Sequence, residues 1–413
     1  MFEDFKVAEL NYVQSTVQST VQGAVQSTDQ GAVQGKHKSG NAVNTVLRPS
    51  DFDAAFEEIS TWENYAPTPL HRLTDLADRL GIADILYKDE SPRFGLQSFK
   101  ALGGAYAGLR VIQRELARQL NRDVSVSEVR SGALAESIAR ITLTSATDGN
   151  HGRSLAWGSQ TFGAPCRIYI HEFVSESRAR AMRDYGAEVI RVPADYDETV
   201  RVTRRESEEN GWFVVSDTSW EGYTQPPIDV MSGYGVMIDE ICADLPEAPT
   251  HMFVQAGVGG LAAAVTARLR QKTGKSTRII AVEPELAACI YASGKTGKAT
   301  TVPVHEETLM AGLSCGEPSA LAWKIINEEV TDFLTIPESV VGPTMRLMAN
   351  PPGADPAITA GESAICGIAA LILASLKPAM KEQLGLDRHA RVLLIGSEGI
   401  TDPEVYAQIM QGL

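Results

Sequence analysis

Apolar and polar positions alternate along most of this chain in patterns that predict helices and strands. Phe52, Phe56 and Ile59 recur on one face of a helix predicted over 50–60. Helices are also predicted over 73–80, 99–120, 152–162, 175–185, 260–273 and 361–376. Short apolar runs between polar or glycine-containing stretches predict strands over 85–88, 141–144, 166–170, 188–192, 212–215, 251–255, 278–282 and 391–395.

This alternation of strand and helix is typical of parallel sheets that are covered by helices on both faces. The alternation forms two blocks, and 413 residues suffice for two or three domains. The fold class predicted is therefore α/β, with two domains that each hold a mainly parallel twisted sheet. We expect a large domain from 41–110 and 226–413, and a small domain from 111–225. A ligand is expected at the carboxyl ends of the strands, in the cleft between the domains.

The N-terminal part of the chain is different, because residues 13–35 repeat a Val-Gln pair followed by two small or polar residues. A period of four drifts around a helix, and one valine per repeat cannot build a core. Residues 1–40 are therefore predicted to be a low-complexity tail, most simply a disordered spacer. An arm that contacts another subunit is the alternative. Order is expected to begin near Val46.

Composition and charge narrow the class of protein. The hydrophobic fraction of 44% and the charged fraction of 22% are those of a globular protein with a sizeable core. A net charge of -15 repels phosphate backbones and anionic membranes, so nucleic-acid and membrane partners are not expected. No apolar run is long enough to cross a bilayer, and the first residues do not resemble a secretory signal. A cytoplasmic enzyme is the resulting prediction.

A glycine-rich turn is the first candidate for chemistry. Gly257, Val258, Gly259 and Gly260 follow a predicted strand and open a predicted helix, and Glu283 lies 26 residues beyond Gly257. Such a turn lets backbone N–H groups approach a phosphate at a helix N-terminus. The spacing to Glu283 also fits a dinucleotide fingerprint. A phosphate ligand of another kind, a dinucleotide and a tight turn without ligand remain open from these residues alone.

Lys100 is the second candidate, because it lies at the start of a predicted helix, where a positive charge is disfavoured. An exposed surface lysine is the ordinary alternative. The small and apolar residues that follow, 101–105, indicate instead a buried helix face. A desolvated lysine beside a positive helix end loses proton affinity and becomes a nucleophile for carbonyl groups.

The segments KDES at 88–91 and SFK at 98–100 resemble the lysine-bearing region of fold-type-II pyridoxal-phosphate enzymes. The run Thr147-Asp-Gly-Asn-His151 resembles their substrate loop. By this resemblance, Lys100 holds pyridoxal 5'-phosphate as an imine and Asn150 contacts its phenolic oxygen. The glycine turn at 257–260 would hold the cofactor phosphate, and Ser397 would face the pyridine nitrogen.

Two departures narrow the resemblance. The chain reads SFKALGG where dehydratases have an arginine two residues after the lysine, and it has Asp148 before Gly-Asn-His. Together with SDTSWEGY at 216–223, these segments are similar to the diaminopropionate ammonia-lyase family. The resemblance implies release of ammonia from 2,3-diaminopropionate, commonly from both enantiomers, to give pyruvate and two ammonia. It also implies a homodimer.

Roles for the acidic residues follow from the resemblance. Lys100 would remove the Cα proton on one face of the substrate. Asp148 would remove the Cα proton of the opposite enantiomer. An Asx turn is the alternative role for Asp148. Asp217 follows a predicted strand and would be a second acid near the substrate, or else the N-cap of the next turn. Two carboxylates would favour a dicationic substrate over serine or threonine.

The remaining candidates are serine, threonine, glycine, histidine and cysteine residues near these motifs. For Ser397, a helix cap for the segment near Pro403 is the alternative to a contact with the ring nitrogen. Ser98, Thr147, Gly149 and His151 are expected to border the substrate, with His151 as a structural member of its loop. A disulfide between Cys289 and Cys315 is an alternative that a reducing cytosol disfavours. The His and Cys spacings match no metal site.

Three other functions compete with the ammonia-lyase. A serine or threonine dehydratase with the same cofactor is the nearest alternative, and substrate assays would separate the two. A nicotinamide-dependent oxidoreductase would use the glycine turn for a dinucleotide. A non-catalytic module that binds pyridoxal phosphate is disfavoured, because the chain keeps every polar group that the chemistry needs.

Overall fold

The structure is a computed structural model that describes residues 2–15, 41–147, 149–194 and 196–412. These residues form two compact units, each built from separate stretches of chain. Unit 1 comprises 1–49, 70–88 and 241–396, and unit 2 comprises 50–69, 89–240 and 397–413. The small domain expected at 111–225 lies within unit 2, whereas the expected segment 41–110 is divided between the units. The domain boundaries drawn from the sequence stay a prediction.

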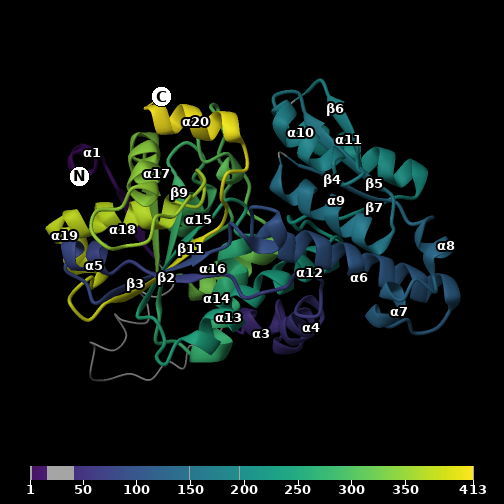
Figure 1. The fold of residues 1–413 in the computed structure, drawn as a ribbon, viewed down its shortest axis with the longest axis horizontal. Coiled ribbons are helices and arrows are strands. Elements are labelled where there is room, and N and C mark those ends of the chain that lie inside the picture. Colours follow the sequence, from purple (N-terminus) through teal and green to yellow (C-terminus); the bar gives the residue numbers. More distant parts are fainter. Residues whose placement is uncertain (1, 16–40, 148, 195, 413) are drawn as a thin grey trace, which may run out of the picture. The chain divides into compact units, whose positions relative to one another are not determined.

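Unit 1 is organised around a seven-stranded sheet in the order β1-β10-β9-β8-β11-β3-β2, of which Figure 1 labels β9, β11, β3 and β2. Its inner strands β10, β9, β8 and β11 are parallel, while β1 pairs antiparallel with β10 and β2 pairs antiparallel with β3. The strands are β1 (Asn11–Gln14), β2 (Leu70–Arg72), β3 (Asp84–Asp89), β8 (His251–Gln255), β9 (Arg278–Pro284), β10 (Asp332–Ile336) and β11 (Arg391–Gly396). Strands β8 and β10 are buried along their whole length, as expected of a sheet covered on both faces.

The helices of unit 1 supply the cover. Helix α18 (Cys366–Leu376) packs against β8, β9 and β10, and its residues are almost all buried. Helix α14 (Gly260–Thr273) packs against α16 (Ala320–Glu329) and β8. The other helical segments are α1 (Glu3–Val7), α3 (Ala42–Thr45), α5 (Thr74–Leu80), α15 (Cys289–Thr296), η2 (Ala311–Leu313), η3 (Glu338–Val340), α17 (Val341–Ala349) and α19 (Pro378–Leu384). Helix α13 (Val236–Asp244) contains the unit boundary.

Unit 2 holds a four-stranded parallel sheet in the order β6-β5-β4-β7 (Figure 1). Its strands are β4 (Leu143–Ala146), β5 (Cys166–His171), β6 (Glu188–Val192) and β7 (Phe213–Val214). Helices α9 and α11 pack on this sheet, and the long helix α6 packs on α9 and α12. The helices are α4 (Pro49–Ile59), η1 (Arg93–Gly95), α6 (Lys100–Leu120), α7 (Val126–Arg130), α8 (Ala135–Ile138), α9 (Asn150–Phe162), α10 (Glu176–Arg183), α11 (Tyr196–Asn210), α12 (Gln225–Tyr234) and α20 (Pro403–Gln411).

Glycines let α6 approach its two neighbours closely. A Cβ atom on Gly158 of α9 would lie 2.7 Å from both Cα and Cβ of Ala105. On α12, a Cβ on Gly233 would lie 2.4 Å from the carbonyl oxygen of Leu102. The helix that begins at Lys100 is therefore held backbone to backbone against two others, which fixes its first turn.

The predicted elements are found with changes at their ends. The α/β class with mainly parallel sheets is confirmed. Strand β4 begins at Leu143, not residue 141, and α18 begins at Cys366 because 362–365 form turns. The expectation that order begins near Val46 is wrong, since α1 and β1 precede it and β1 pairs with β10. Residues 16–40, which include most of the repeat, lie outside the described residues.

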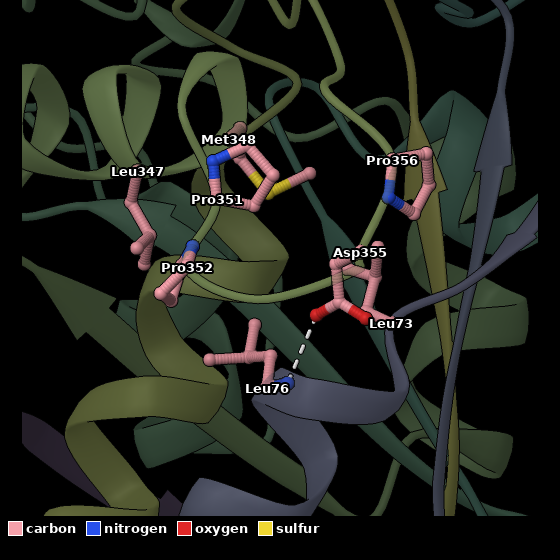
Figure 2. A pocket seen from close by; sticks show the side chains of 8 residues that line it. All are labelled: Leu73, Leu76, Leu347, Met348, Pro351, Pro352, Asp355 and Pro356. Carbon is pink, nitrogen blue, oxygen red and sulfur yellow. Dashed lines mark hydrogen bonds between the residues drawn. The ribbon is translucent and has the colours of Figure 1, made fainter.

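A small pocket in unit 1 lies between the start of α5 and the loop that follows α17 (Figure 2). Leu73, Leu76 and Met348 help to line it, and none of the predicted site residues does. Both carboxylate oxygens of Asp355 accept N–H groups at the start of α5, from Asp75 and Leu76, at 2.9 Å each. This cap holds the proline-rich loop over α5. None of the helices that the structure describes is long and apolar enough to cross a membrane.

A buried ionic cluster anchors the loop that leads to Lys100. Arg93 is fully buried and donates to the carboxylates of Glu90 at 2.9 Å and of Glu240 at 2.8 Å. Thr68 donates from its hydroxyl to Glu90 at 2.5 Å. Beyond Arg93, the backbone takes left-handed φ angles at Phe94 (51°) and Gln97 (58°). Those conformations are costly for residues with side chains, so firm anchoring at Arg93 is needed to hold the loop in this form.

Replacement of Arg93 by methionine should destabilise the protein strongly. The variant leaves two carboxylates buried without their cation, which costs about 3–5 kcal/mol of the free energy of unfolding. Urea denaturation of Arg93→Met and the wild type measures the difference. Arg118→Met is the matched control, because Arg118 pairs with Glu115 but its side chain is 73% exposed, and a loss below about 1 kcal/mol is expected. Equal losses in the two variants would contradict the role of the cluster.

Candidate functional site

Lys100 and Asp217 form an ion pair in unit 2. Lys100 is the first residue of α6, and Asp217 follows the short strand β7. The Lys100 Nζ donates to the Oδ2 of Asp217, and the two side chains are only 21% and 18% exposed. Burial alone would raise the pKa of the Asp217 carboxyl, but the Lys100 ammonium and then His151 outweigh it and hold that pKa far below its usual range. The carboxylate therefore stays charged beside the amine.

The segment before Lys100 is tied to the chain just after β11. Ser98 and Glu398 form an isolated antiparallel bridge. The Phe99 N–H donates to the carbonyl of Ser397 at 3.0 Å, and the Gly399 N–H donates to the carbonyl of Gln97 at 2.9 Å. The Lys100 N–H donates to the Ser98 hydroxyl at 3.3 Å. Two predicted site residues, Ser98 and Ser397, are thus held beside Lys100 by backbone pairing.

Asn150 is oriented by its neighbours. Its Nδ2 donates to the Oε2 of Glu398 at 2.5 Å, and its Oδ1 accepts from the Nη2 of Arg153 at 3.3 Å. Arg153 also donates to the carbonyl of Leu96, in the loop before Lys100. An arginine can only donate and a carboxylate can only accept, so the amide oxygen must face Arg153 and the amide nitrogen Glu398. The Asn150 amide therefore has a second N–H, which can donate to another acceptor.

The loop before Asn150 is closed by Thr147. Its hydroxyl accepts the N–H groups of Gly149 at 3.1 Å and of Gly152 at 3.2 Å. Asp148, predicted as the second base, lies outside the described residues. His151 is buried, with its Nε2 2.8 Å from the carbonyl of Val215 and its Nδ1 4.0 Å from Asp217. A carbonyl only accepts, so Nε2 carries the hydrogen, and His151 links the loop to the end of β7.

A stacked pair of aromatic rings supports the turn that carries Asp217. The Tyr223 hydroxyl donates to the carbonyl of Val214 and accepts the N–H of Ser216, both at 2.9 Å. The Trp220 ring stacks on Tyr223 with centroids 3.9 Å apart, and the Arg204 guanidinium lies 3.5 Å from the Trp220 centroid. The SWEGY segment thus fixes the backbone just before Asp217.

A helix-cap role for Ser397 is not found, whereas the N-cap alternative for Asp217 stays a prediction. In the turn after β7, the Thr218 N–H donates to the hydroxyl of Ser216 at 3.2 Å. Helix α20 is capped by Asp402, whose carboxylate accepts from the N–H groups of Glu404 and Val405. Asp217 pairs with Lys100 through one carboxylate oxygen, and Ser397 is buried beside the lysine segment.

The glycine turn lies in unit 1, between β8 and α14. Gly259 has a left-handed φ of 97° and precedes the first residue of α14, Gly260. A Cβ on Gly257 would lie 3.2 Å from the Cys315 Sγ and 3.3 Å from the Gly312 carbonyl oxygen. The first N–H groups of a helix have no partner within it, so this end of α14 has the features of an anion site.

Glu283 does not have the role that a dinucleotide fingerprint would give it. Its two carboxylate oxygens accept the N–H groups of Ile290 at 2.8 Å and of Tyr291 at 2.6 Å, at the start of α15. Glu283 is buried, and burial raises its pKa to about 8. The side chain therefore caps a helix. Cys289 and Cys315, both close to Gly257, are not joined by a disulfide in the structure.

The predicted residues of unit 2 are close together, but the sequence analysis missed several side chains around them. Arg153 and Glu398 orient Asn150, and Tyr223 supports Asp217. Arg153 lies one helical turn after Asn150 and Glu398 follows Ser397, so both could have been suspected from their positions. No spacing in the sequence connects Tyr223 with Val214. Within the described ranges, no group of three or more His, Cys, Asp or Glu side chains is arranged to hold a metal ion.

Comparison with known proteins identifies the family. The family described as pyridoxal-phosphate dependent enzyme matches residues 61–398. Diaminopropionate ammonia-lyase of Escherichia coli K12 is 40% identical over 355 residues, 84% of this chain and 87% of that protein. A crystal structure of the Escherichia coli enzyme with an aminoacrylate-PLP azomethine reaction intermediate has a TM-score of 0.83 and 34% identity, and the match covers 98% of each chain. L-threonine ammonia-lyase of Geobacter sulfurreducens is 30% identical over only 50% of this chain and 48% of its own length. The chain therefore belongs to the pyridoxal-phosphate dependent enzymes and, among them, to the diaminopropionate ammonia-lyase family.

Proposed function

We propose that this chain releases ammonia from 2,3-diaminopropionate by α,β-elimination. The immediate product, aminoacrylate, reacts with water to give pyruvate and a second ammonia. The similarity to the Escherichia coli diaminopropionate ammonia-lyase supports this substrate, because it extends over 84% of the chain. The dehydratases and the threonine ammonia-lyase are less similar, at 24–30% identity against 40%, which makes a dehydratase the weaker alternative.

The Lys100–Asp217 pair is the observation that carries the proposal. When bound, pyridoxal phosphate supplies an aldehyde that a lysine amine can take up and a ring that accepts electrons as the substrate Cα–H bond breaks. Lys100 fits the attachment point, since its amine is largely buried at a helix start and is paired with the Asp217 carboxylate. Asp217 keeps the lysine nitrogen in one place, and its negative charge attracts a cationic substrate.

The groups around Lys100 fit the remaining parts of the cofactor. The N–H that Asn150 retains suits the phenolic oxygen, which is an acceptor when ionised. We propose that Ser397, buried beside the lysine segment, faces the pyridine nitrogen. In unit 1, the backbone N–H groups of the turn Gly257-Val258-Gly259-Gly260 suit a phosphate. A hydroxyl opposite the pyridine nitrogen leaves it largely unprotonated, which favours prompt loss of the β-amine over transamination.

The substrate is assigned to the loop between β4 and α9. We propose that Ser98, Thr147, Gly149 and His151 border its carboxylate and that Asp148 accepts a Cα proton. Lys100 would accept the proton of one enantiomer, and Asp148 that of the other, because the two protons point to opposite faces. Asp148 could then return a proton to the departing β-amine. A cytoplasmic homodimer remains a prediction of the family resemblance.

Removal of the lysine amine should abolish turnover. Lys100→Ala is expected to release pyruvate from either diaminopropionate enantiomer about 10³-fold more slowly than the wild type, because the base and the attachment point are lost together. Lys324→Ala, a change of an exposed lysine on α16, is the matched control and should keep full activity. Serine and threonine, assayed in parallel, test the alternative. Faster turnover of serine or threonine than of diaminopropionate would favour the dehydratase.

Asp148→Asn should separate the two enantiomers. The amide cannot accept a proton, so one enantiomer is expected to lose turnover by about 10²- to 10⁴-fold while the other keeps most of it. Pyruvate release from the pure D and L forms measures this ratio. Loss on neither enantiomer would show that Asp148 is only a turn residue.

The orientation of Asn150 should depend on Arg153. Asn150→Ala and Arg153→Met are each expected to raise the dissociation constant of pyridoxal phosphate by about five- to twenty-fold, the value of one or two hydrogen bonds. In the double variant the effects should not multiply, since Arg153 acts through Asn150. Arg183→Met, which removes a surface arginine from the same unit, is the control. Multiplicative losses would mean that Arg153 acts through its contact with the Leu96 carbonyl instead.

A further inference from the structure

Tyr234 carries a buried hydroxyl that the site described above does not use. The residue ends α12 and is 2% exposed. Its hydroxyl oxygen has no hydrogen-bond partner among the residues that the structure describes. A buried polar group left in this state costs free energy, and native proteins contain few of them. The hydroxyl therefore needs an explanation, either in packing or in function.

Its position points to the first turn of α6. A Cβ on Gly103 would lie 2.4 Å from the Cε1 of Tyr234 and 2.9 Å from its Cζ, the ring atom that bears the hydroxyl. The Phe99 ring also contacts the Tyr234 ring, with centroids 4.6 Å apart. Gly103 lies one helical turn after Lys100, on the same face of α6. The absence of a side chain at 103 thus admits a tyrosine ring beside Lys100.

The charged groups that act on this hydroxyl are those of the ion pair. Burial raises the pKa of Tyr234 well above its ordinary value, while the Lys100 ammonium lowers it and the Asp217 carboxylate raises it. The hydroxyl therefore keeps its proton at any working pH. A protonated hydroxyl can both donate and accept a hydrogen bond.

We infer that Tyr234 is a positioning residue for Lys100, whose hydroxyl holds the lysine nitrogen when the attraction to Asp217 is lost. A carboxylate attracts an ammonium strongly and a neutral amine only weakly. Lys100 must become neutral before its nitrogen can attack a carbonyl carbon. The hydroxyl suits the neutral state, because it can donate to the lone pair of the amine. This inference rests on the proposed attachment of the cofactor at Lys100.

A structural role for the hydroxyl would have different consequences. Tyr223 is the natural comparison, since its buried hydroxyl makes two hydrogen bonds to the backbone. Tyr223→Phe removes both of them and should lower the Tm of the cofactor-free protein by about 2–4 °C. Tyr234→Phe removes a hydroxyl that has no partner there, so the Tm should stay the same or rise.

The experiment measures Tm and cofactor attachment in the full chain. Pyridoxal phosphate is added to cofactor-free wild type, Tyr234→Phe, Tyr223→Phe and Lys100→Ala, samples are reduced with borohydride at intervals, and the mass of the protein reports covalent attachment. Tyr234→Phe is expected to attach the cofactor about ten-fold more slowly than the wild type at an undiminished Tm.

Two results would overturn the inference alone. One is attachment at the wild-type rate in Tyr234→Phe, and the other is a fall in its Tm as large as that of Tyr223→Phe. Attachment of the cofactor to Lys100→Ala would show that Lys100 is not the attachment point. That result would contradict the proposed function and, with it, the role of Tyr234.

Discussion

The ion pair between Lys100 and Asp217 is the contact on which the arrangement of unit 2 depends. A largely buried ammonium is stable only beside a partner of opposite charge, so the start of α6 and the end of β7 must stay together. Close helix packing through glycines fixes one side of this pair. On the other side, the Tyr223 hydroxyl holds the backbone around Asp217. The site thus consists of two charged side chains and a rigid frame around each.

Much of the fold could be predicted from local patterns, because strands and helices in α/β proteins have clear hydrophobic periods. Helix α14 and strands β6 and β8 have the predicted ends. Strand β10 was not predicted, although its five residues are all buried. The sequence DFLTI contains two polar residues, and only pairing with β9 and β1 makes it a strand. Pairing between distant segments leaves no local signal.

The site shows the same division between local and distant information. Lys100, Asn150 and the glycine turn belong to short motifs, so the sequence identifies them. Tyr234 is a single residue outside these motifs, and its contact with the start of α6 arises only from tertiary packing. Glu283 is an opposite case, because its spacing suggested a ribose contact while its carboxylate caps α15. Spacing in sequence cannot tell what a carboxylate will meet.

Strand β1 has a consequence for the behaviour of the chain in solution. It pairs with the outer flank of β10, which is buried over its whole length, while β1 itself has only four, partly polar residues. Exposed long apolar edges recruit strands from other molecules, and short polar edges do so much less. The residues of β1 therefore protect the large sheet from aggregation, and a chain trimmed to start after Gln14 would lose that protection.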